Sequence, residues 1–335
     1  MDVFELTRAL VDIESVTNAE AQVGEFLFAL LSRFAAATGG RAERMGVEPG
    51  RFNVVAAWGH PVVTLSTHMD TVPPFFASRE DSEYIFGRGS CDAKGIIASM
   101  IVAAERLRAD GVENFALLFV VGEERNSAGA SVAARSPIGS RYLINGEPTE
   151  NKLALASKGA LRLELVARGK MAHSAYPELG ESAIDALLDA LEAVRRLPLP
   201  TDELLGRCTL NIGTIAGGRA PNVIPDSAKA EILVRTVGDS APIRDAIATL
   251  LNGRVELREV LSAPAVFFED VEGFPTTVVS FTTDVPILSP SWGKPLLIGP
   301  GSIHVAHTSQ ERVAKGELKE AVGIYSNLVR RLLAN

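Results

Sequence analysis

The sequence predicts an α/β protein that carries an inserted α+β domain, and two features of the element order lead to this class. Up to about residue 157, strand-like and helix-like segments alternate, which is typical of a layered α/β domain. From 158 to 265 the expected order becomes β-α-β-β-α-β, the split βαβ arrangement of a complete small domain. The chain then returns to the first domain. We therefore expect one domain at 1–157 with 266–335 and a second domain at 158–265.

Apolar residues that recur every three or four positions predict the helices of the first domain. These helices are expected at 2–14, 20–37, 94–109, near 127–135 and at 309–333. Strands are expected at 52–58, 62–67, 115–121 and 141–145. The segment FALLFVV at 115–121 is apolar at every position, which is typical of a strand buried on both faces.

The second domain begins with a strand at 159–169, where apolar and polar residues alternate as in a strand with one wet face. An amphipathic helix is expected next, then two strands, a second helix and a last strand, at 180–196, 207–215, 226–237, 241–252 and 254–260.

Composition excludes several classes of function. With 335 residues, 47% hydrophobic and 22% charged, the chain resembles ordinary globular proteins of two domains. A net charge of -8 argues against a surface for nucleic acid or anionic membrane. The apolar runs are too short to span a membrane, and the N-terminus lacks the pattern of a signal peptide. Cys91 and Cys208 form no CxxC motif, so we expect two reduced thiols in a cytoplasmic protein.

Ionisable residues gather at the carboxyl ends of the expected strands, where open α/β sheets bind their ligands. They come from five separate segments: His68, Asp70, Asp92, Glu123, Glu124, Glu147 and His307. Each has an ordinary alternative, because Asp92 could cap the next helix, the glutamates could be solvated loop residues and a histidine could belong to the core. Their coincidence favours a metal site, since several buried carboxylates in one cleft repel each other unless a cation lies between them. Histidine and carboxylate ligands suit zinc.

Spacing suggests a division of roles among these residues. Neighbours in an extended strand point in opposite directions, so Glu123 and Glu124 are not expected to bind the same ion. One can bind metal while the other holds the attacking water. His68 and Asp70 are two positions apart and share a face, so Asp70 can accept the second N–H of His68 and orient its ring.

The motifs resemble those of the M20 metallohydrolases, the group of carboxypeptidase G2, acetylornithine deacetylase and succinyl-diaminopimelate desuccinylase. The matching segments follow the family order and span nearly the whole chain: STHMDTVP, GRGSCDAKG, VGEERNSAGA, GEPT, HSAYPELGESAI, GGRAPNVIPDSAKAEILVR and GPGSIHVAHTSQE. The resemblance implies a three-layer α/β/α, zinc-exopeptidase-like catalytic domain. It also implies that the insert is a ferredoxin-like lid and dimerisation domain, and hence a homodimer.

The resemblance also implies a centre of two zinc ions, with cobalt as a substitute. His68 and Glu147 would bind one ion, Glu124 and His307 the other, and Asp92 both. The AHT context favours His307 over the nearby His304. Two such ions polarise a scissile carbonyl and activate a water molecule.

The remaining roles also come from the resemblance. Glu123 would be the general base that passes a proton to the leaving amine, and Asp70 would stand behind His68. His173 matches a histidine that reaches across the dimer to the oxyanion in the partner's site. Asn222 and Arg235 match lid positions that bind substrate, and an arginine suits a substrate carboxylate. Their ordinary alternatives are a turn residue for Asn222 and a wet-face strand residue for Arg235.

These observations predict a zinc amidohydrolase that cleaves the N-acyl amide of a small amino-acid derivative, such as N-acetylornithine or N-acetyllysine, in amino-acid biosynthesis. The alternative on the same scaffold is a dipeptidase or carboxypeptidase. A non-catalytic binding or scaffold homologue is disfavoured because Glu123 and Asp92 are both present. A nucleotide site is excluded, since GRGSCD lacks a third glycine and no GKS or GKT follows.

Overall fold

A computed structural model describes residues 1–334, which form two compact units. Unit 1 contains residues 1–155, 268–277 and the chain from Thr283 onward, and unit 2 contains 156–267 and 278–282. The main boundaries lie within about two residues of the expected ones. The structure differs in assigning the short segment 278–282 to unit 2, which no sequence pattern predicts.

Unit 1 is built on a six-stranded sheet with the order β1-β2-β6-β3-β7-β19. The strands β6, β3, β7 and β19 run parallel, whereas β2 is antiparallel to β6 and to β1. In chain order their bounds are Arg41–Glu48, Arg51–Trp58, Val63–His68, Phe115–Val120, Tyr142–Asn145 and Lys294–Leu297, for β1, β2, β3, β6, β7 and β19. The carboxyl ends of the four parallel strands therefore lie at the same edge of the sheet.

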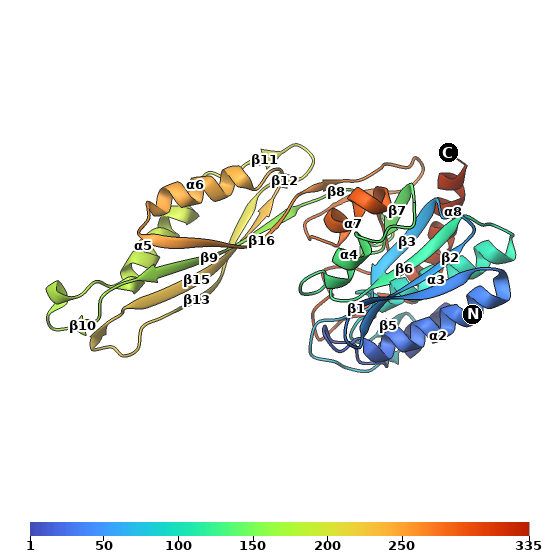
Figure 1. Cartoon of the computed structure of the whole chain (residues 1–335), viewed down its shortest axis with the longest axis horizontal. Coiled ribbons are helices and arrows are strands. Elements are labelled where there is room, and N and C mark those ends of the chain that lie inside the picture. The colour runs from blue at the N-terminus through green and yellow to red at the C-terminus, as the bar shows by residue number, and fades with distance from the viewer. Residues whose placement is uncertain (335) are drawn as a thin grey trace. The chain divides into compact units, whose positions relative to one another are not determined.

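Helices cover both faces of this sheet (Figure 1). One face packs against α1 (Val3–Val11), α2 (Ala21–Thr38), α3 (Lys94–Ala109) and α8 (Lys315–Leu333). The other face packs against α4 (Ala128–Ala133) and α7 (Val285–Trp292). This is the three-layer α/β/α arrangement that was expected.

Strand β6 shows why the layers form. Leu117 and Phe119 belong to the large core on one face, while Leu118 and Val120 belong to the smaller core on the other. Because successive side chains of a strand point to opposite faces, an uninterrupted apolar run places a central strand between two helical layers.

A small sheet in unit 1 corrects one expectation. The strands β4 (Arg79–Glu80), β5 (Tyr84–Phe86) and β20 (Arg312–Ala314) pair in the order β20-β5-β4. The last helix therefore begins at Lys315 and not at residue 309, because the residues before it pair with a distant strand.

Unit 2 has the expected split βαβ order. Its sheet has the order β13-β15-β9-β16, with every neighbouring pair antiparallel. The helices α5 (Ala183–Arg195) and α6 (Ala241–Leu251) pack on one face of this sheet (Figure 1). The strand bounds are Gly159–Arg168, Thr209–Gly217, Ser227–Thr236 and Val255–Ala263, for β9, β13, β15 and β16.

The remaining elements are short. The pairs β10–β14 and β11–β12 and the 3-10 helix η1 lie in unit 2, at Ala172–His173, Val223–Ile224, Thr201–Asp202, Gly206–Arg207 and Pro177–Leu179. The connecting segments contain β8, β17 and β18, at Leu153–Ser157, Val266–Phe267 and Thr276–Val279. Over the residues described, no helix combines the length and apolar character needed to cross a membrane. Cys91 and Cys208 are both buried free thiols.

Candidate metal centre

The parallel strands of unit 1 bring the candidate ligands to one edge of the sheet. His68 is the last residue of β3, the Glu123–Glu124 pair follows β6, and Glu147 follows β7 by two residues. Asp92 lies in the loop before α3, and His307 lies in the loop after β19. His68, Glu124 and Glu147 therefore lie near the ends of parallel strands, as expected from the sequence, whereas Asp92 is placed by the loop before α3.

Asp92 lies between the two histidines. Its Oδ1 is 3.0 Å from Nε2 of His68, and its Oδ2 is 3.2 Å from Nε2 of His307. Oε1 of Glu124 is 3.0 Å from the same Nε2 of His307, whereas His304 makes neither contact. Ligand atoms of His68, Asp92 and Glu124 all lie within 4.8 Å of one another. The carboxylate of Asp92 therefore faces one histidine with each of its oxygens.

Asp70 supports this cluster differently from the expectation. Nδ1 of His68 lies 3.0 Å from the backbone carbonyl of Asp70 and 3.5 Å from its Oδ1, so the carbonyl is the nearer acceptor. The carboxylate accepts the backbone N–H groups of Glu123 at 3.1 Å and Glu124 at 3.2 Å, and the hydroxyl of Thr17 at 2.7 Å. Asp70 therefore faces the ring with its backbone carbonyl and, at the longer distance, with its carboxylate, which also anchors the glutamate pair.

Glu123 and Glu124 do not lie in an extended strand, contrary to the prediction from their spacing. Strand β6 ends at Val120, and the glutamates lie in a turn whose following amides, from Arg125 to Ser127, donate to the carbonyl of Gly122. Strand alternation therefore does not apply to them. The two carboxylates nevertheless differ. The carboxylate of Glu124 contacts His307, whereas the carboxylate of Glu123 makes no hydrogen bond within residues 1–334.

Burial and charge around the cluster fit a bound cation. Glu147 is only 5% exposed, and its Oε1 has no hydrogen-bond partner among the described residues. Burial raises the pKa of Glu147 and of Glu123 well above the usual range. Such carboxylates are costly when ionised without a positive partner. Imidazole nitrogens with carboxylate oxygens form a donor set that zinc accepts, so the residues present fit a divalent metal.

The two imidazoles are held by carboxylates. Hydrogen bonds to Asp92 and Glu124 raise the pKa of His307 to about 10. For His68, burial opposes the charged ring, but bonds to Asp70 and Asp92 prevail and its pKa is well above the ordinary value. His307 also has a left-handed backbone, with φ of 62°, a conformation that non-glycine residues adopt at a cost and that is common at functional sites.

Sequence analysis missed Asp284, which lies close to this cluster. It is 1% exposed, and burial raises its pKa to about 6 although an interaction with the side chain of Ser127 opposes the rise. It precedes α7, whose segment VPILSPSW contains Pro286 and Pro290. Two prolines argue against a helix in a sequence, so no expected element end marked this acid.

The other candidates lie in unit 2. His173 pairs with Val223 across β10 and β14, and the amide of Ser174 donates to the carbonyl of Asn222 at 3.1 Å, so His173 and Asn222 are neighbours. Both side chains are exposed. Arg235 is half-buried on β15 and donates from Nη1 to the hydroxyl of Thr282 at 2.8 Å.

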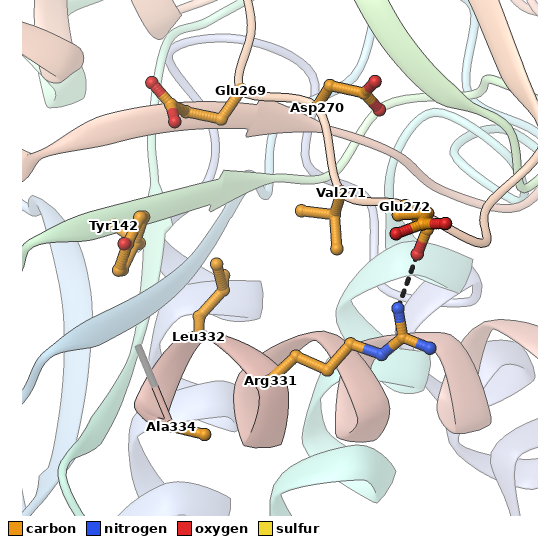
Figure 2. Close-up of a pocket in the computed structure, with 8 residues that line it drawn as sticks. All are labelled: Tyr142, Glu269, Asp270, Val271, Glu272, Arg331, Leu332 and Ala334. Atoms are coloured by element: carbon orange, nitrogen blue, oxygen red, sulfur yellow. Dashed lines mark hydrogen bonds between the residues drawn. The ribbon is translucent and has the colours of Figure 1, made fainter.

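A separate cavity of about 420 Å³ in unit 1 contains none of the candidate residues (Figure 2). Its polar lining includes Glu269, Asp270, Glu272 and Arg331. Arg331 is already bonded, since its Nη1 donates to the carbonyl of Glu272 at 2.5 Å (Figure 2). The cavity has no histidine or cysteine in its lining and does not extend the candidate metal centre.

Comparison with known proteins supports this fold. Residues 155–256 match the family model of the peptidase dimerisation domain, M20_dimer. A peptidase M20 domain-containing protein of Schizosaccharomyces pombe is 38% identical, with 97% of this chain and 83% of that protein covered. A probable carboxypeptidase of Aspergillus niger is 37% identical, with 96% of this chain and 88% of that protein covered.

Among solved structures, an M20 family metallo-carboxypeptidase from Sulfolobus solfataricus superposes with a TM-score of 0.80 over 99% of both chains. The identity is 14%, so this likeness concerns the fold. The architecture is a mixed α/β catalytic domain with an inserted dimerisation domain.

Proposed function

This chain belongs to the M20 family of metallohydrolases, and on that premise we propose that it is a carboxypeptidase that removes the C-terminal residue of short peptides. Support comes from relatives named probable carboxypeptidases, such as those of Aspergillus niger and Aspergillus terreus, which are 37% and 38% identical over 96% of this chain. They favour the peptidase alternative over cleavage of an N-acetyl amino acid.

The observation that carries the proposal of a two-metal centre is the position of Asp92. With one oxygen toward each histidine, it would bridge two ions, His68 and Glu147 would complete one side, and Glu124 and His307 the other. We propose zinc, with cobalt as a substitute. Such ions supply Lewis acidity to the scissile carbonyl and make a water molecule more acidic.

Glu123 is the proposed general base. Its carboxylate is free of hydrogen bonds to the described residues, and its backbone is fixed by the carboxylate of Asp70 at 3.1 Å. Burial raises its pKa, which brings a glutamate closer to the range in which it can both take and return a proton. Glu123 would remove a proton from the attacking water and deliver it to the leaving amine.

Arg235 is the proposed partner of the substrate α-carboxylate. Among the described residues it forms no ion pair, and its one side-chain bond is to Thr282. Burial lowers its pKa, since the charged guanidinium is partly withdrawn from water without an anion beside it. A carboxylate would satisfy it through paired hydrogen bonds. We also propose that Asn222 contributes to substrate binding and that His173 stabilises the oxyanion in a dimer.

A substrate panel with the zinc- or cobalt-loaded protein tests this function. Short peptides with a free C-terminus should be cleaved, the same peptides with a C-terminal amide should not, and N-acetylornithine and N-acetyllysine should react more slowly. Faster release of acetate than of a C-terminal amino acid would overturn the carboxypeptidase proposal in favour of the deacetylase. Metal-stripped protein is the control.

Replacement of Glu123 by Ala tests the base. Loss of general acid–base catalysis lowers rates by about 10²–10⁴-fold. We expect a kcat loss of this size with unchanged metal content, measured by metal analysis of the same preparation. The surface variant Glu113→Ala is the control, and wild-type activity in Glu123→Ala would exclude this residue as the base.

A further inference from the structure

A buried ion pair, Arg88–Glu311, lies beside the proposed metal centre without belonging to it. Nη1 of Arg88 is 2.5 Å from Oε2 of Glu311, and the two residues are 2% and 1% exposed. They are 223 positions apart in the chain. Two charges withdrawn from water this completely are stable only when further hydrogen bonds satisfy them, so their other contacts show what the pair holds in place.

Glu311 binds the loop that carries Asp92. Its Oε1 accepts the backbone N–H of Gly89 at 2.9 Å and that of Asp92 at 3.3 Å. The amide of Gly87 donates to the backbone carbonyl of Glu311 at 3.2 Å. Three backbone amides of one loop are therefore bonded to one residue. One of these amides is that of Asp92, whose carboxylate faces both His68 and His307.

Arg88 extends the connection to the segment that follows His68 and Asp70. Its Nε donates to the carbonyl of Pro74 at 3.2 Å, and its guanidinium carbon lies 5.0 Å from the ring centre of Phe76. Glu311 is itself four positions after His307. The pair thus joins the three loops that present His68, Asp92 and His307.

We propose that Arg88 and Glu311 are positioning residues that hold Asp92 between the two histidines and thereby raise the affinity of the centre for its metal ions. The inference rests on the proposed metal centre. Its physical basis is that a bridging carboxylate must keep both oxygens in place within a few tenths of an ångström. Groups that support ligands from behind typically contribute about 10–100-fold in metal affinity or activity.

The test uses Glu311→Gln, which keeps the size of the side chain but removes the charge that Arg88 requires. The dissociation constants for Zn²⁺ and Co²⁺ are measured by competition with a chelator, and the visible spectrum of the Co²⁺-loaded protein reports the ligand geometry. We expect about 10–100-fold weaker metal binding and an altered spectrum. The melting temperature of the metal-stripped protein is recorded in parallel.

The matched control is Glu20→Gln. Glu20 forms a buried, two-bond pair with Arg51, at 2.8 and 2.6 Å, with exposures of 1% and 6%. None of the bonds of this pair reaches the Asp92 loop. We expect Glu20→Gln to lower the melting temperature as Glu311→Gln does. The metal dissociation constants and the cobalt spectrum of Glu20→Gln should stay close to those of the wild type.

A second variant covers the case in which Glu311→Gln does not fold. Glu311→Asp keeps the charge for Arg88 but withdraws the carboxylate from the amide of Asp92, so metal affinity should fall although the fold remains. Wild-type metal affinity in either folded variant, or equal losses in Glu20→Gln, would overturn the inference. Absence of metal binding by the wild-type chain would instead overturn the proposed centre.

Discussion

The carboxylate of Asp70 lies where three parts of unit 1 meet, because it accepts bonds from Thr17, Glu123 and Glu124 while its carbonyl faces His68. The ring of His68 is thus held by a backbone atom that a substitution of the side chain leaves in place. The turn of Glu123 and Glu124 depends on the side chain itself. The carboxylate of Asp70 consequently acts on the proposed base Glu123 and on the proposed ligand Glu124 through the turn that they share.

We predict that Asp70→Asn retains metal but reduces kcat by about 10–100-fold. An asparagine offers one carbonyl oxygen and one NH₂ group, so one amide of the pair Glu123–Glu124 would face a donor. An unsatisfied buried N–H costs about 1–3 kcal/mol, so the melting temperature should fall as well. Thr17→Val, which removes a different bond to the same carboxylate, should have a smaller effect on kcat. Loss of the metal from Asp70→Asn would contradict this prediction and show that metal binding needs the carboxylate of Asp70, either as a ligand or through its bond to Glu124.

His307 gives the metal-free protein a pH dependence whose sign can be worked out. Its pKa is raised from 6.5 to about 10 by Asp92 and Glu124, so the folded state holds this proton more tightly than the unfolded state. The stabilisation is complete below about pH 6.5 and is lost as the pH rises through 10. Because the side chain is 50% exposed, solvent screening keeps the effect small.

We predict that the melting temperatures of metal-stripped wild type and His307→Gln differ most near pH 6 and converge toward pH 10. A difference that stays constant over this range would contradict the raised pKa. Metal ligands must be deprotonated, so metal binding at neutral pH should release the proton of His307. Calorimetric titration in buffers of different ionisation enthalpy measures that release.

At the scale of elements, two helical glycines of unit 1 have opposite surroundings. A Cβ on Gly95, in the first turn of α3, would lie 2.4 Å from the backbone carbonyl of Ser90, in the loop that carries Asp92. A Cβ on Gly323, in the middle of α8, would meet nothing within 4 Å. Ala is favoured over Gly within helices by about 1 kcal/mol when no clash opposes it.

Gly323→Ala should therefore stabilise the protein by about 0.5–1 kcal/mol, as measured by denaturant unfolding. Gly95→Ala should destabilise it, because the helix start and the Ser90 carbonyl cannot both keep their positions. We expect Gly95→Ala also to weaken metal binding through the neighbouring Asp92. Equal stabilisation by both substitutions would show that the loop before α3 adapts freely.

The sequence predicts best those elements whose pattern of apolar residues lies entirely within the element. The helix expected at 94–109 has the bounds of α3, and the apolar run at 115–121 forms β6 with one residue less. His68, Glu124 and Glu147 lie near one another because parallel strands share a carboxyl edge, which can be deduced from strand order, whereas the position of Asp92 depends on the loop before α3.

The features that sequence reasoning missed depend on distant partners. Residues 312–314 form β20 only because β5 is available to pair with them, so the start of α8 is not encoded locally. Glu311 falls within the helix expected at 309–333, and its ion pair with Arg88, 223 positions away, has no local signal. Asp284 precedes a helix with two prolines, so no local pattern marks it as a buried acid, yet it lies near His68 and Asp70. In each case the local structure depends on contacts with residues that are distant in the sequence.

At the scale of the whole molecule, the two edges of the unit 2 sheet differ in a way that bears on assembly. Strand β13, TLNIGTIAG, has no charged side chain, whereas β16, VELREVLSA, has Glu256, Arg258 and Glu259. Charges on an edge strand discourage pairing with another chain, and an uncharged edge invites it. The dimerisation-domain match at 155–256 includes all of β13 and ends near the start of β16. We therefore expect a homodimer that forms through β13.

The matched pair Ile215→Lys on β13 and Val260→Lys on β16 tests this expectation. The two side chains are 57% and 50% exposed, so neither substitution disturbs a core. In a dimer joined along β13, Ile215→Lys would place two like charges close to one interface and should shift the protein toward monomer, while Val260→Lys should leave the mass unchanged. Light scattering coupled to size-exclusion chromatography gives the mass directly. A wild-type monomer, or a dimer that only Val260→Lys disrupts, would exclude β13 as the interface.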